Sequence, residues 1–291
     1  MNQLFARLGV ALINLAGLLP QRTRTLIANM LADAFWLLAR PHRHVTLTNL
    51  RLCFAQLTER ERARIGRNSF RNMLRAALDH SILWHADRAE IERYVRIEGE
   101  QHLTNSSNRP LIVIAPHFFG LDAGGVRVSI LMQLASIYSR QKNSVWDDWL
   151  LKARRRFNEP ILIQRQDLNM RQVVRVLKDR VPFYYLPDTD LGPTNSIFVP
   201  FFGVAAATIP MVSRLARLTG AKVVMAVTEM TRDGYIIHFD SPWSDFPGAS
   251  IEDDTARMNR ELERWILRLP DQYLWSHKRF KTRPPGEGRV Y

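Results

Sequence analysis

The chain has 291 residues, with 41 lysines and arginines against 28 aspartates and glutamates. That length can bury a sizeable core. The formal net charge of +13 predicts an anionic partner: nucleic acid, a membrane surface or an acidic protein. The only cysteine, Cys53, excludes an internal disulfide and a cysteine-rich metal site, and its apolar neighbours predict that it packs as a small hydrophobe.

Two apolar stretches, Leu4 to Pro20 and Leu26 to Ala39, predict a pair of N-terminal helices. The uncharged run in the first, residues 8–19, is shorter than the roughly 20 residues that a membrane-spanning helix needs. We therefore expect two helices that lie on or dip into a membrane. A tilted span by the first helix and an ordinary pair of core helices are the alternatives. A secretory signal peptide is disfavoured, because no small-residue cleavage site follows.

On this interpretation, residues 1–40 form a membrane-associated helical anchor and residues 41–291 a single further domain, since no Pro-, Gly- or Ser-rich linker divides the remainder. From Arg40 to about Arg96 the pattern predicts basic helices. Their arginines form either a solvated face or, beside a membrane anchor, a contact for anionic lipid head groups; they are Arg60, Arg62, Arg64, Arg67, Arg71 and Arg75.

Short apolar runs and helical patterns alternate after residue 110, which predicts an α/β fold with a mixed central sheet flanked by helices. The predicted strands are Leu111–Ala115, Leu134–Tyr138, Pro160–Ile163, Pro182–Leu186, Ile197–Phe201, and a hairpin of Val223–Met230 with Tyr235–Phe239. The predicted helices are Asp147–Arg156, Asn169–Lys178, Met211–Thr219 and Thr255–Leu269.

The segment 115–122 follows the first buried strand, where ligands bind in open α/β sheets. It contains His117 and Asp122. If Asp122 stands on the first turn of the next helix, its carboxylate can accept the proton on one imidazole nitrogen and leave the other to deprotonate a hydroxyl. No Gly-x-Ser-x-Gly elbow supplies an enzyme nucleophile, so the alcohol would come from the substrate. A lone His–Asp pair is also common as a purely structural contact.

Later segments resemble one family along essentially the whole chain. Together with the apolar N-terminus and the HFFGLD box, they are Pro187-Asp188-Thr189-Asp190 with Gly192, the FVPFFG run before Ala205-Ala206-Ala207-Thr208, and the WSHKRFKTRP ending. This combination resembles the bacterial lipid A biosynthesis acyltransferases, the lauroyl and myristoyl transferases of the lysophospholipid acyltransferase superfamily. The box is shared by that superfamily, whereas the later motifs are more specific.

The resemblance implies transfer of a fatty acyl chain from acyl carrier protein to a hydroxyl of a lipid A precursor. We expect no acyl-enzyme, because no suitable nucleophile is apparent, and no metal or other cofactor, because two carboxylates supply too few oxygen ligands. It implies that His117 is the base, that Asp122 orients it, and that Arg155, one of three consecutive arginines, assists. Asp188 and Asp190 match the Asp-x-Asp element, although Thr189 departs from the amide or imidazole more usual between them. We expect these two aspartates to be part of the substrate-binding site and to form hydrogen bonds within it.

Several basic side chains are candidates for the phosphates of the acceptor or for the acidic carrier protein: Arg140, Arg155, Lys278, Arg279, Lys281 and Arg283. A basic face on the anionic membrane explains the same residues equally well. The acyl chain needs an apolar slot, which four phenylalanines can line unless they are core: Phe118, Phe119, Phe201 and Phe202.

The expected location is the cell inner membrane, with the catalytic domain on the cytoplasmic side. One alternative keeps the enzyme class but changes the acceptor to a lysophospholipid or a lyso-aminolipid. Another is a non-enzymatic basic protein at a membrane surface or on nucleic acid. The sequence contains no helix-turn-helix or ribonucleoprotein motif, so we expect no nucleic acid partner.

Overall fold

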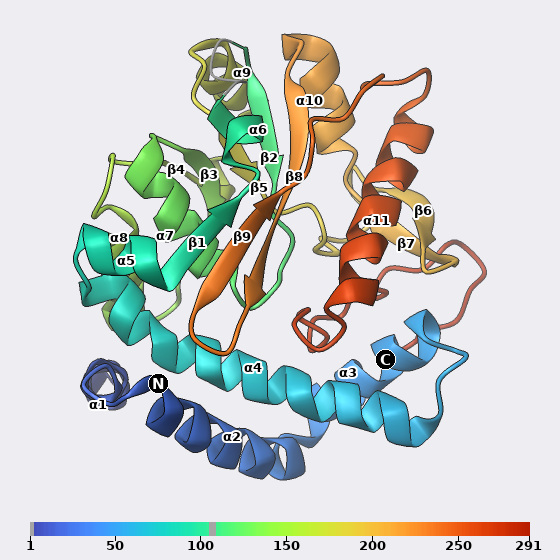
Figure 1. Cartoon of the computed structure of the whole chain (residues 1–291). Helices are drawn as coiled ribbons and strands as arrows, with labels where there is room; N and C mark the ends of the chain where they lie inside the picture. Colours follow the sequence, from blue (N-terminus) through green and yellow to red (C-terminus); the bar gives the residue numbers. More distant parts are fainter. Residues whose placement is uncertain (1–2, 105–108) are drawn as a thin grey trace.

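The computed structural model of the chain describes residues 3–104 and 109–291 (Figure 1). A seven-stranded sheet with the order β1-β9-β8-β2-β5-β3-β4 forms its centre. The strands are β1 (Val95–Glu98), β2 (Leu111–Ile114), β3 (Ala135–Tyr138), β4 (Ile161–Gln164), β5 (Phe183–Tyr185), β8 (Lys222–Met230) and β9 (Tyr235–Phe239). All neighbours are parallel except β8 and β9, which form an antiparallel hairpin. The predicted mixed sheet and its hairpin are confirmed.

One predicted strand lies elsewhere. β6 (Ile197–Phe201) pairs with β7 (Val204–Thr208) in a separate antiparallel ribbon and not in the main sheet. The tight turn between them places Phe202 at φ +50° and Gly203 at φ +75°, a left-handed pair typical of two-residue hairpins. The sequence analysis missed β7 and also β1, a strand of only four residues that directly follows a helix.

The helices cover both faces of the sheet. They are α3 (Arg40–Cys53), α4 (Glu59–His85), α5 (Arg88–Tyr94), α6 (Glu100–Thr104), α7 (Leu121–Leu131), α8 (Ser144–Arg154), α9 (Met170–Lys178), α10 (Met211–Thr219) and α11 (Ile251–Arg268), with a 3₁₀ turn at Arg165–Asp167. Successive residues of β2 point to opposite faces: Ile112 and Ile114 pack in the core that α9, α10 and α11 share, whereas Leu111 and Val113 pack in the core beneath α7. Cys53 is buried in the first of these cores, as predicted.

Two N-terminal helices, α1 (Gln3–Ala16) and α2 (Gln21–Leu38), lie beneath α4 at the base of the molecule (Figure 1). A buried ion pair joins α2 to α4, because Arg24 Nε lies 3.3 Å from Asp79 Oδ1 and neither side chain is more than 3% exposed. The hydroxyl of Tyr235 on β9 donates to the other oxygen of Asp79 at 2.9 Å. The helical base is therefore joined to the sheet through buried polar contacts.

The exposed surface of α1 and α2 is rich in apolar side chains. Its large exposed hydrophobic side chains are Leu4, Phe5, Leu8, Leu12, Leu15, Leu18, Leu26, Met30, Leu31, Leu37 and Leu38, each at least 50% exposed. Along residues 3–104 and 109–291, no helix has both the length and the apolar character needed to cross a bilayer.

Candidate active site

Two loops meet where the neighbouring parallel strands β2 and β5 end. His117 stands in the loop after β2, and Asp188 stands in the loop after β5. Nδ1 of His117 lies 2.7 Å from Oδ1 of Asp188, and the backbone N–H of His117 donates to Oδ2 of the same carboxylate at 2.9 Å. Because strand order brings the two loops together, residues 71 positions apart form one hydrogen-bonded unit.

The C-terminal segment fixes the His117 loop from the other side. The carbonyl of His117 accepts from the backbone N–H of Leu274 at 3.0 Å, and the N–H of Phe119 donates to the carbonyl of Gln272 at 2.9 Å. The imidazole of His117 is 29% exposed while Asp188 is 1% exposed. The imidazole is therefore reachable from solvent, and the carboxylate that orients it is not.

The electrostatics of the pair assign the tautomer of His117. Burial opposes ionisation of Asp188, but the adjacent His117 and its hydrogen bonds hold the pKa of that carboxyl well below its ordinary value. An ionised carboxylate only accepts, so Nδ1 of His117 carries a proton and Nε2 is the free base when the ring is neutral. Burial alone would lower the pKa of His117; the charge and hydrogen bond of Asp188, with a contribution from Asp122, raise it overall.

Asp122 has different partners from those predicted. It stands on the first turn of α7, as expected, but its Oδ2 lies 3.1 Å from Nε2 of His80 on α4, and its Oδ1 accepts from Nη2 of Arg154 on α8 at 3.0 Å. The carboxylate that holds the His117 ring is thus Asp188, and the predicted hydrogen bond between His117 and Asp122 is wrong. Asp122 still acts on His117 through its charge.

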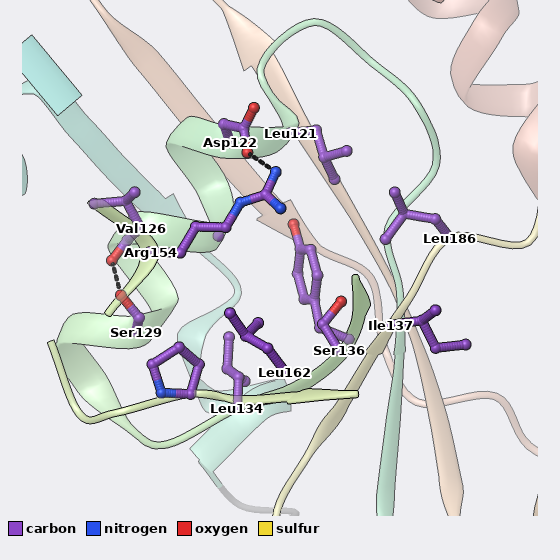
Figure 2. A pocket seen from close by; sticks show the side chains of 13 residues that line it. Leu121, Asp122, Val126, Ser129, Leu134, Ser136, Ile137, Arg154, Leu162 and Leu186 are labelled. Atoms are coloured by element: carbon purple, nitrogen blue, oxygen red, sulfur yellow. Dashed lines mark hydrogen bonds and ion pairs between the residues drawn. The ribbon is translucent and has the colours of Figure 1, made fainter. Parts of the chain in front are cut away.

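Arg154, and not the predicted Arg155, is the arginine that contacts Asp122. Arg154 is the last residue of α8, and its guanidinium reaches Asp122 (Figure 2), whereas Arg155 follows the helix end and is exposed. Arg156, the third of the consecutive arginines, donates to the backbone carbonyls of Leu83 and Ala86 and not to Asp122.

An apolar cavity of about 130 Å³ lies next to these residues, between α7 and the strands β3, β4 and β5 (Figure 2). Asp122 and Arg154 supply its charged lining, and the other lining residues are Leu121, Gly125, Val126, Ser129, Leu134, Ser136, Ile137, Pro160, Leu162, Tyr184 and Leu186. The lining is therefore mostly apolar, with its charge confined to Asp122 and Arg154 and hydroxyl groups on Ser129, Ser136 and Tyr184.

The four phenylalanines expected to line an acyl slot are not in this lining. Phe118 and Phe201 are at most 2% exposed in the core, Phe202 packs against the same core, and Phe119 packs in the core beneath α4 and α7. The core interpretation of these residues is correct, and the position of the apolar slot was not predicted.

Two of the expected substrate-binding residues have internal partners. Asp190 is 3% exposed, and its carboxylate accepts from the backbone N–H of Gly192 and from the N–H and hydroxyl of Thr282. Arg279 is 2% exposed and donates to the carbonyl of Ala207 and the hydroxyl of Thr208. A buried guanidinium with these bonds fixes the C-terminal segment onto the β6–β7 ribbon, and the role of Arg279 in substrate binding stays a prediction.

Of the remaining three, Asp188 binds His117, whereas Arg140 and Lys278 are exposed, and the cavity lining contains none of them. Arg140 lies 3.7 Å from Asp147, and Lys278 lies 5.7 Å from the ring of Tyr291. Among residues 3–104 and 109–291, no group of three or more His, Cys, Asp and Glu side chains is arranged to hold a metal ion.

Two histidines near the site were not singled out from the sequence. His80 contacts Asp122, and His277 accepts from the backbone N–H of Asp190 at 3.3 Å. Burial lowers the pKa of His277 to about 4, although Asp188 opposes this change. His277 lies in the C-terminal motif and was identifiable by that context, whereas His80 lies within a helix whose pattern gave no such signal.

Comparison with known proteins adds independent information. The model of the family "Bacterial lipid A biosynthesis acyltransferase" matches residues 2–282. The lipid A biosynthesis lauroyltransferase of Escherichia coli (strain K12) is 31% identical over 243 residues, 82% of this chain and 78% of that protein. The myristoyltransferase of the same organism is 30% identical over 291 residues, 98% and 90% of the two chains. A solved structure, the 1-acyl-sn-glycerophosphate (LPA) acyltransferase PlsC from Thermotoga maritima, aligns with 86% of this chain and 98% of that chain at 15% identity with a TM-score of 0.39.

Proposed function

The chain belongs to the bacterial lipid A biosynthesis acyltransferases, and on that premise we propose that it transfers a fatty acyl chain from acyl carrier protein to a hydroxyl of a lipid A precursor. The observation that carries this proposal is that the chain segments next to His117 and Asp188 also line the apolar cavity. Leu121 and Asp122 begin α7, directly after the His117 loop, Leu186 precedes Asp188 on the other loop, and all three line the cavity.

The chemistry follows from the free Nε2 of His117. The acceptor hydroxyl gives its proton to Nε2 as its oxygen attacks the thioester carbonyl, and Asp188 stabilises the imidazolium that forms. The tetrahedral intermediate then expels the thiolate, which takes the proton back from Nε2. The products are the ester and the free thiol, and His117 returns to its neutral state.

The negative charge on the carbonyl oxygen needs hydrogen-bond donors. The backbone N–H groups that directly follow His117 are engaged, because Phe118 donates to Pro116 and Phe119 donates to Gln272. We therefore assign stabilisation of this oxygen to the N-terminus of α7, whose dipole favours negative charge, and to the guanidinium of Arg154. The cavity between α7 and the sheet accommodates the start of the acyl chain.

We assign contact with the membrane to residues 1–40 and acyl transfer to residues 41–291. Two helices with exposed leucines, neither of which combines the length and the apolar character needed to span, suit insertion in the plane of the interface. Beside α2, a groove is lined by Trp36 and by four arginines of α4, which are Arg60, Arg64, Arg67 and Arg71. Guanidinium groups at this edge favour anionic head groups, which agrees with a placement at the cytoplasmic face of the inner membrane.

Purified protein tests the proposal directly when it is offered a lipid A precursor with acyl carrier thioesters of several chain lengths. We expect one ester-linked chain per acceptor, detected by mass spectrometry. A lysophospholipid or lyso-aminolipid, offered in parallel, measures the choice of acceptor, and acyl coenzyme A measures the choice of donor. Acylation of a lyso-lipid alone would overturn the proposed acceptor, and no acylation of any of them would overturn the proposed reaction.

A further inference from the structure

Each oxygen of the Asp122 carboxylate has its own partner. Arg154 on α8 binds Oδ1, and Nε2 of His80 on α4 lies 3.1 Å from Oδ2. Burial would raise the pKa of Asp122, but Arg154 and His80 hold it well below its ordinary value. The carboxylate is therefore ionised and only accepts, so the nitrogen of His80 that faces it is a donor.

Aromatic rings fix the orientation of His80. Its ring centroid lies 4.5 Å from that of Trp84 and 6.0 Å from that of Trp149, and the side chain is 19% exposed. Trp149 also contacts Trp146 at 5.5 Å, against which Gly9 of α1 packs closely. Because Trp84 and Trp149 hold the His80 ring, its N–H points in one direction. A long flexible donor such as lysine would not keep a fixed direction.

The geometry points to His80 as a positioning residue of the acyl transfer, which holds the Asp122 carboxylate between the cavity and His117. This inference rests on the proposed function. Arg154 alone leaves Oδ2 without this donor and allows the carboxylate to turn. A displaced charge stabilises the imidazolium of His117 less in the transition state, so His80 acts on the rate through Asp122 and has no contact with the reacting atoms.

Four variants test the inference in the full-length protein. His80→Phe keeps an aromatic ring against Trp84 and removes the donor, whereas His80→Gln places an amide N–H close to the position of Nε2. His80→Asn carries the same amide on a shorter side chain that does not reach. His85→Phe is the matched control, because His85 lies on the same helix and its Nε2 contacts Asn14, outside the site.

Steady-state transfer from the acyl carrier thioester to the lipid A precursor is measured for each variant, with thermal unfolding in parallel. His80→Phe and His80→Asn lower kcat by about tenfold or more, the factor that corresponds to one pKa unit of lost charge stabilisation. The KM of both substrates stays within about twofold. His80→Gln restores most of kcat, and His85→Phe leaves it unchanged.

The inference is overturned if the wild-type protein is active and His80→Phe keeps its kcat, or if His80→Gln is as slow as His80→Phe at equal thermal stability. If His80→Phe does not fold, the comparison of His80→Gln with His80→Asn decides on its own. Absence of transfer by the wild-type protein would instead contradict the proposed function, so the two failures are distinguishable.

Discussion

Nδ1 of His117 lies 2.7 Å from Oδ1 of Asp188, whereas Asp122, only five positions after His117, binds His80 and Arg154. The site thus contains two carboxylates with separate duties. Asp188 sets the tautomer and direction of the imidazole, and Asp122 places a fixed negative charge near it.

The two aspartates of the Asp-x-Asp element are expected to respond differently to the same substitution. Asp188→Asn lowers kcat by about 10³- to 10⁴-fold, because an amide no longer holds the productive tautomer of His117. Asp190→Asn lowers the thermal unfolding temperature instead, since Asp190 accepts from Gly192 and Thr282. Kinetics and thermal unfolding of both variants test this; equal kinetic losses in the two would contradict it.

The pH dependence of kcat/KM follows from the raised pKa of His117. The reaction needs the neutral ring, so activity is lost as the pH falls through that pKa. The acid limb therefore lies above the ordinary histidine value of about 6.5. In Asp188→Asn the raising charge is gone while burial still lowers the pKa, so the limb of the residual activity moves to lower pH. A limb that moves upward would refute the assignment.

Gly124 and Gly125, neighbouring glycines of α7, allow a matched comparison of how an added methyl group changes the stability of the fold. A Cβ on Gly124 would lie 2.1 Å from Oγ1 of the buried Thr228, whereas a Cβ on Gly125 would meet nothing within 4 Å. Gly124→Ala should destabilise the protein by about 1–3 kcal/mol through overpacking. Gly125→Ala should stabilise it by about 0.5–1 kcal/mol through helix propensity. Denaturant unfolding measures both, and the opposite order would show that α7 does not approach β8 this closely.

If α1 and α2 contact the membrane, the effect of an added charge on membrane binding depends on where the charge is placed. Leu12→Glu with Leu15→Glu places two carboxylates on the exposed face of α1, so binding to anionic vesicles should fall at least about tenfold. Leu218→Glu with Leu267→Glu is the control, because these leucines are 63% and 59% exposed on α10 and α11. Vesicle sedimentation compares the pairs. Equal losses of vesicle binding in the two double variants would mean that α1 and α2 are not the membrane contact.

The sequence predicted most of the sheet, because runs such as Leu111–Ile114 are apolar and β-branched and are followed by amphipathic helices. β1 was missed because two of its four residues, Arg96 and Glu98, are charged. β7, the second strand of the β6–β7 ribbon, was missed because the turn before it needs a positive φ at Phe202, which a large side chain rarely shows.

The loop that carries His117 was predicted correctly, and its partner was not. Residues close in sequence suggested Asp122, but the contact with Asp188 depends on β2 and β5 being neighbours, and strand order cannot be read from periodicity. His80 and Arg154 depend in the same way on how α4 and α8 pack around α7. Local patterns thus located the base, while tertiary packing determined which side chains surround it.

The most direct test of the account is single-turnover transfer from acyl carrier thioester to lipid A precursor by His117→Gln, compared with wild-type protein of equal thermal stability. The account predicts a loss of at least about 10²-fold, the lower end of what a general base contributes. Transfer by His117→Gln within about threefold of the wild-type rate would contradict the claim that this imidazole takes the proton of the acceptor hydroxyl.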